Sequence, residues 1–171
     1  MRTKEKVRLA PHDALLVLTN HQTGEVRQIW GRNIVTDAGD TYYAQRACTE
    51  APTNTFANLY LATAGPVAVG KTDDYSDFTV VAGSSKAVTA TYPMTDDADV
   101  DNVGAGVDIV TWLFTYTVGD GPFAAITHSF IAKAGAGGVD PILNSYEWAA
   151  AWAKDASTSA KIFANHEMLG S

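Results

Sequence analysis

Hydrophobic and polar residues alternate along most of this chain, which is the pattern of β-strands that bury one face. The apolar run ALLVLTN, the polar HQTGE and the alternating VRQIW predict a β-hairpin over residues 14–30. The late run VDIVTWLFTYTV places Trp112, Phe114 and Tyr116 on one face. Runs rich in Val, Thr, Tyr and Phe lie at residues 58–64, 78–83, 86–94 and 107–118.

One segment has helical spacing instead. In NIVTDAGDTYYAQRACTE, Thr36 or Asp37 can cap a helix that carries Tyr42 and Tyr43 on its apolar side. Cys48 falls on the same side, so we expect a buried, unreactive thiol.

The last third of the chain combines strand patterns with an ambiguous segment. FAAITHSFIAKAG predicts a strand, residues 134–138 (AGAGG) a loop, and KIFANHEML a closing strand. SYEWAAAWAKDA predicts a short helix or an irregular segment. Trp148 and Trp152 there are four residues apart, so they form one stripe that either joins the core or covers a neighbouring subunit.

These elements predict a mainly β fold, an antiparallel β-sandwich or jelly-roll-like single domain with one or two short helices. The length of 171 residues suits one domain, and 46 % hydrophobic with 18 % charged residues indicates a packed core. We expect an N-terminal arm at residues 1–13 and the β-rich domain at residues 14–171.

The net charge limits the kinds of partner that the protein can bind, and the cysteine content limits its disulfides. The net charge of -7 disfavours nucleic acid and anionic membranes. Positive charge gathers in the arm, at Arg2, Lys4, Lys6 and Arg8, which we expect to dock on an acidic neighbouring subunit. One cysteine permits no intrachain disulfide, and the sequence has neither a membrane-spanning run nor a secretory signal, so we expect synthesis in a cytoplasm.

Residues 65–72, GPVAVGKT, match the P-loop pattern of nucleotide-binding proteins. A working P-loop joins a buried strand to a helix whose N-terminus binds the phosphates. The strand is present in LYLATA, but the following DDYSDFTVVAGSS does not predict a helix, and its carboxylates oppose a triphosphate. We therefore interpret GPVAVGKT as a loop between two strands and keep nucleotide binding as a distant alternative.

The other groups of polar residues give only weak indications of a metal or catalytic site. Asp97, Asp99 and Asp101 alternate before Asp108 in the outline of a calcium loop, but Asn102 replaces the glycine and Asp108 the bidentate glutamate, so an acidic surface loop is the competing interpretation. The histidines, at positions 12, 21, 128 and 166, lie in four separate segments. We expect no catalytic residue, no cofactor and no metal, and a protein that is not an enzyme.

Several of these segments together resemble a known family. The hairpin with TGEV, then NIVTDAGDTYYAQ, FANLYLATA, KTDDYSDF and VDIVTWLFTYT are similar to small virion proteins of tailed bacteriophages. The resemblance covers roughly residues 14–118, with KIFANHEML as a weaker match, and it brings no active-site residue.

The resemblance implies a virion protein made in the host bacterial cytoplasm. We expect a capsid decoration or cement protein, a homotrimer that bridges capsomers and binds the major capsid protein. The alternative is a tail-associated adaptor or a fibre or receptor-binding protein. The interface residues would be Arg2, Lys4, Lys6 and Arg8 in the arm, together with Trp148 and Trp152.

Overall fold

The computed structural model describes residues 13–95 and 109–167, which form one ten-stranded antiparallel sheet and one α-helix. The predicted mainly β fold is therefore confirmed. The elements are β1 (Asp13–Asn20), β2 (Val26–Val35), α1 (Asp37–Ala47), β3 (Asn58–Ala64), the 3-10 turn η1 (Tyr75–Asp77), β4 (Thr79–Val80), β5 (Lys86–Ala87), β6 (Met94–Thr95), β7 (Ile109–Tyr116), β8 (Phe123–Ala132), β9 (Ile142–Lys154) and β10 (Thr158–Glu167).

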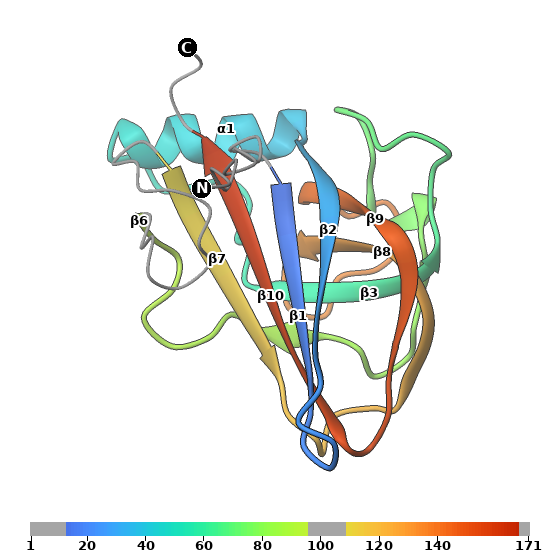
Figure 1. Cartoon of the computed structure of the whole chain (residues 1–171). Helices are drawn as coiled ribbons and strands as arrows, with labels where there is room; N and C mark the ends of the chain where they lie inside the picture. Colours follow the sequence, from blue (N-terminus) through green and yellow to red (C-terminus); the bar gives the residue numbers. More distant parts are fainter. Residues whose placement is uncertain (1–12, 96–108, 168–171) are drawn as a thin grey trace, which may run out of the picture.

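The sheet curls until its two ends approach each other. Its strand order is β4-β3-β8-β9-β2-β1-β10-β7-β6, and β5 pairs with β3. The segment that follows β5 reaches the other end, because Thr89 donates its backbone N–H to the Leu113 carbonyl of β7 at 2.8 Å. Figure 1 shows β3 crossing the direction of β1, β7 and β10, so the two halves of the curled sheet enclose a core.

Strand alternation fills this core. Leu16 and Leu18 of β1 and Trp112 and Phe114 of β7 face inward, each at most 4 % exposed. Two smaller apolar clusters also form: one contains Tyr60, Phe78 and Phe130, and the other contains Leu15, Leu113 and Phe163. Leu15 and Leu113 alternate with the inward residues of β1 and β7, so these strands are apolar on both faces.

α1 closes one end of the curled sheet (Figure 1). Thr36 caps it as predicted, accepting a hydrogen bond from the Gly39 N–H at 3.1 Å. Gly39 allows a close approach, because a Cβ atom there would lie 2.1 Å from the Leu143 carbonyl oxygen of β9. Tyr42 and Tyr43 then enter the core.

β2 and β9 pair over only part of their length. They are bonded from Gly31↔Trp148 to Val35↔Asn144, and Figure 1 shows them diverging towards the end opposite α1. β9 also bulges, because one residue of β8 lies between the paired Ile126 and His128, whereas four residues of β9 lie between their partners Trp152 and Glu147.

Four predictions are corrected. Residues 145–154 of SYEWAAAWAKDA lie in strand β9 instead of a helix. Trp148 and Trp152 are buried, 5 % and 2 % exposed, which confirms that they join the core and contradicts their assignment as interface residues. Cys48 is exposed because α1 ends at Ala47 and Cys48 is its C-cap. The expected strands at residues 78–83 and 86–94 shorten to two-residue pairings.

Candidate interaction surfaces

The GPVAVGKT segment packs against the first turn of α1. The Lys71 carbonyl accepts a hydrogen bond from the Asp37 N–H at 2.9 Å, and the Lys71 ammonium pairs with Asp40 at 2.5 Å. Between Thr72 and β4 the only helical element is the three-residue η1. The loop therefore lies beside the N-terminus of a helix that precedes it in sequence, which is not the strand–loop–helix arrangement of a P-loop.

A shallow pocket of about 300 Å³ opens between this loop, the start of α1 and the loop after β8. Its charged side chains are Asp37, Lys71, Asp73 and Asp74. The two loop carboxylates already have structural partners: Asp73 accepts from the Gly70 N–H at 2.8 Å, and Asp74 accepts from the Ser76 N–H at 2.7 Å. Three carboxylates around one ammonium make the pocket unfavourable for a phosphate.

The loop after β8 is fixed to the same region. The Tyr75 N–H donates to the Asp140 carbonyl at 3.0 Å, and Lys133 pairs with the Asp140 carboxylate at 2.8 Å. Hydrogen bonds from Lys133 and from the Gly137 N–H lower the pKa of Asp140. The loop containing residues 65–74 and the loop of residues 133–141 thus form one anchored pair, which we call the paired loops.

The paired loops carry the two most exposed large hydrophobic side chains of the described residues. Val67 is 99 % exposed and Val139 is 77 % exposed. Apolar side chains held in water on anchored loops are typical of contact points for another macromolecule.

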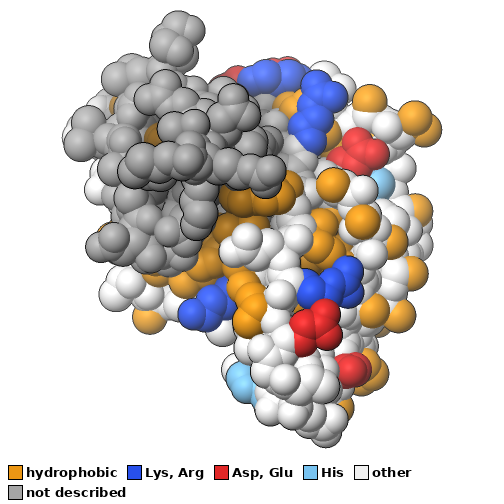
Figure 2. All heavy atoms as spheres, viewed as in Figure 1, with side chains coloured by type: hydrophobic (Ala, Val, Ile, Leu, Met, Phe, Trp, Pro, Cys, Tyr) orange, Lys and Arg blue, Asp and Glu red, His pale blue; other side chains and the backbone are white. Residues whose placement is uncertain are grey.

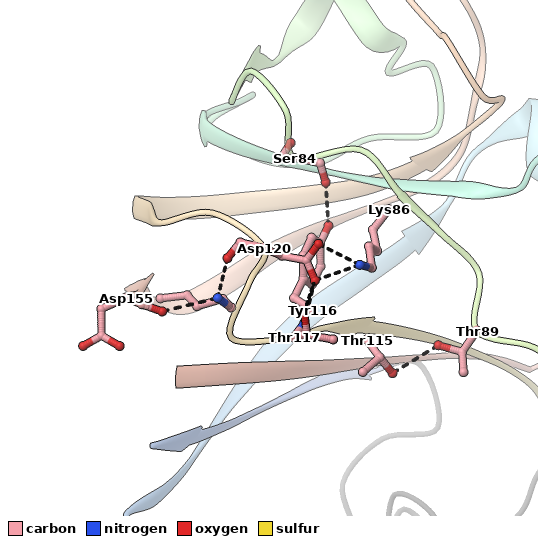
Figure 3. A network of polar contacts seen from close by, with 9 residues as sticks. Ser84, Lys86, Thr89, Thr115, Tyr116, Thr117, Asp120 and Asp155 are labelled. Atoms are coloured by element: carbon pink, nitrogen blue, oxygen red, sulfur yellow. Dashed lines mark hydrogen bonds and ion pairs between the residues drawn. The ribbon is translucent and has the colours of Figure 1, made fainter. Parts of the chain in front are cut away.

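A polar network lies at the other end of the curled sheet, where β7 turns into β8 (Figure 3). Lys86 donates to both carboxylate oxygens of Asp120 at 2.8 Å, and the Thr117 N–H donates to one of them at 2.6 Å. The Lys86 hydrogen bond is the largest of the effects that lower the pKa of Asp120. Asp120 therefore ties β5 to the β7–β8 turn.

Lys154 joins this network from β9. It is 1 % exposed and donates to the backbone carbonyls of Asp120 and Asp155. Burial lowers its pKa. Tyr116 lies beside Lys86, whose ammonium is 5.7 Å from the centre of the tyrosine ring. Tyr116 donates to the Ser84 carbonyl at 2.8 Å, and burial raises its pKa well above the usual range. These groups fix three chain segments together.

A second polar network, which sequence reasoning missed, lies inside the core beneath α1. The Tyr43 hydroxyl accepts from Trp112 Nε1 at 2.8 Å and contacts His166 Nδ1, while Asn144 Nδ2 lies 2.7 Å from His166 Nε2. Burial raises the pKa of Tyr43 well above its usual range. Ile162, Ala164 and His166 occupy every second position of β10 and so share its inward face, and this spacing is the sequence signal that could have placed the histidine in the core.

The remaining sequence candidates have different outcomes. His21 is exposed and bonds Ser159, whereas His128 is buried in the sheet. Arg2, Lys4, Lys6, Arg8 and His12, and likewise Asp97, Asp99, Asp101 and Asp108, lie outside the described residues. Across residues 13–95 and 109–167, no group of three His, Cys, Asp or Glu side chains could hold a metal, and no helix could cross a membrane.

Comparison with protein-family models, curated proteins and solved structures found no match.

Proposed function

We propose that this protein is a structural component of a tailed-bacteriophage virion, a decoration protein that binds the major capsid protein and stabilises the head by bridging capsomers. The observation that carries the proposal is the exposure of Val67 and Val139 on the paired loops. The resemblance of residues 14–118 to small phage virion proteins supplies the class of assembly.

The paired loops suit such a contact physically. Burying these two exposed valines on a partner removes apolar surface from water without unfolding anything in this chain. The anchoring by Lys71–Asp40 and Lys133–Asp140 holds the loops before binding, so little conformational entropy is lost on contact. A homotrimer would present three such loop pairs at one junction between capsomers and so strengthen the attachment through multivalency.

The test is to mix the purified protein with undecorated phage heads and image the particles by electron microscopy. We expect many copies at the junctions between capsomers. Density on the tail alone would instead support an adaptor or a fibre protein, and the absence of density on any particle would refute the proposal.

A pair of variants tests which surface makes the contact. Val67→Asp with Val139→Asp should weaken binding to the heads about thirtyfold or more, because an interface anchor typically contributes about 2 kcal/mol. Val118→Asp is the matched control, since Val118 is 43 % exposed in the β7–β8 turn, outside the paired loops. Equal binding by both variants would exclude the paired loops as the capsid contact.

A further inference from the structure

One half of β2 has a free edge. β1 pairs with β2 from Val26 to Arg32, whereas β9 pairs with it only from Gly31 to Val35. Over Val26–Trp30 the side of β2 that faces β9 therefore has no strand partner among the described residues. Every second residue there directs its backbone N–H and C=O groups outward from the sheet.

A cleft of about 230 Å³ lies beside this edge, between the first residues of β2 and the end of β9. Leu18 and Ala153 give it an apolar base, and Glu25, Arg27 and Asp155 line it with charge. Hydrogen bonds from Thr158 and Ser157 lower the pKa of Asp155, which keeps this carboxylate anionic. Figure 2 shows basic and acidic side chains next to one another on the lower part of the surface that it draws.

An edge of this kind selects an extended backbone as its partner, because only a strand satisfies its alternating donors and acceptors. At the two ends of the sheet, by contrast, little strand edge is left unpaired. β4 and β6 are two residues long, and Thr89 bonds the edge of β7. The five residues Val26–Trp30 have no such cover within the described part of the chain.

We propose that residues 1–12 of a second copy of this chain pair as a β-strand with β2 over Val26–Trp30. This inference does not depend on the capsid proposal. Residues 1–12 carry four cations and Glu5, which gives them a net charge of +3. Since the whole chain has a net charge of -7, the remaining residues have a net charge of -10. The two parts therefore attract each other.

The arm also has the period of a strand. Arg2, Lys4, Lys6 and Arg8 occupy alternate positions, so in a strand all four face one side, where Glu25 and Asp155 can pair with them. Twelve extended residues span about 40 Å, more than the roughly 17 Å of a five-residue edge.

A second copy is the better source of the strand than the same chain. Asp13, which follows residues 1–12 and begins β1, pairs with Arg32 on the β1 side of β2, and there the β9 side is occupied over Gly31–Val35. An arm from its own chain would have to cross over this paired region before it reached Val26–Trp30. An arm from a second copy meets no such obstacle.

The test uses the full chain, with light scattering for its mass and hydrogen exchange for its amides, at low and high protein concentration. We expect self-association at high concentration, with exchange at alternate amides of Val26–Trp30 slowing about tenfold or more. Lys4→Glu with Lys6→Glu should abolish both changes. Lys161→Glu with Arg46→Glu is the charge-matched control and should preserve them.

Exchange at Leu59–Ala62, within the core, should stay slow in every variant and so report that the fold is intact. Three results would overturn the proposal: a monomer at all concentrations, self-association that leaves Val26–Trp30 exchanging freely, or protection of these amides that does not depend on concentration, which would indicate the arm of the same chain.

Discussion

Buried polar side chains fix the position of α1 on the sheet. The Tyr43 hydroxyl accepts the Trp112 Nε1–H, and both residues are inside the core. Tyr43→Phe would leave this indole donor without its partner, and an unpaired buried donor destabilises a protein by about 1–3 kcal/mol. We therefore expect a loss of this size in the free energy of unfolding, measured by chemical denaturation.

Tyr42→Phe is the matched control for this prediction. Tyr42 precedes Tyr43, is buried to a similar degree, and its hydroxyl makes no hydrogen bond to the other described residues. It should change the unfolding free energy by less than about 0.5 kcal/mol. A similar loss in both variants would mean that removing a buried hydroxyl here is destabilising in itself, and that the loss in Tyr43→Phe does not report the hydrogen bond to Trp112.

Asp120 makes the stability of the fold depend on pH. Its pKa is lowered in the folded protein from the ordinary value of 3.8, so between the folded and unfolded values the unfolded chain binds more protons. The stabilisation is present above pH 3.8 and is lost as the pH falls through the folded pKa. Asp120→Asn should lower the unfolding free energy at pH 7 by about 1 kcal/mol, given partial solvent screening.

Urea unfolding at several pH values checks this prediction. The difference between the native protein and Asp120→Asn should shrink as the pH falls below 3.8. A difference that is constant from pH 7 to pH 2 would show that the carboxylate charge of Asp120 does not act in this way.

Gly39 decides how closely α1 lies on β9. Alanine has the higher helix propensity, by about 1 kcal/mol, so Gly39→Ala would stabilise an isolated helix. Here the new Cβ would meet the Leu143 carbonyl at 2.1 Å, a backbone atom that cannot turn aside. We expect a net destabilisation of about 1–3 kcal/mol in thermal unfolding.

Gly137→Ala serves as its control, because no atom lies within 4 Å of a Cβ atom there. The thermal midpoint of this variant should stay near that of the native protein. If Gly39→Ala raised the midpoint instead, the close packing of α1 on β9 would be refuted.

β9 shows why local pattern was insufficient for the fold. Residues four apart share a face in a strand as well as in a helix, so the spacing of Trp148 and Trp152 fits both. The intervening Ala149–Ala151 favour a helix by propensity, but the residues on either side of them pair with β8 and β2 and hold this segment in a strand. Tertiary contacts, which no local window contains, decided this element.

Elements with two agreeing local signals were predictable. The hairpin of β1 and β2 has alternation and a polar turn, and α1 has periodicity and a Thr36 cap. The network of Tyr43, Trp112 and His166 was not, because Tyr43 lies 69 positions from Trp112 and 123 positions from His166 along the chain. The register of β10 against β7 brings them together, and register is not visible in the sequence of either strand.

The distribution of charge over the whole molecule is uneven, since residues 1–12 carry +3 and the remainder carries -10. Attraction between such parts acts over the Debye length, which falls from about 10 Å at 0.1 M salt to about 3 Å at 1 M. Apolar contacts behave oppositely, because salts that are excluded from protein surfaces strengthen them. Salt therefore separates electrostatic association through the arm from association through an apolar face.

If copies associate through the arm, the apparent Kd of self-association should rise about tenfold between 0.1 M and 1 M sodium chloride, because screening removes the attraction. Sedimentation equilibrium measures this directly. The Lys4→Glu, Lys6→Glu chain should already be monomeric at low salt and should show no further change. Association that persists or strengthens at 1 M would assign the contact to an apolar surface, such as that around Val67 and Val139, and would remove charge attraction as the force that recruits the arm to β2.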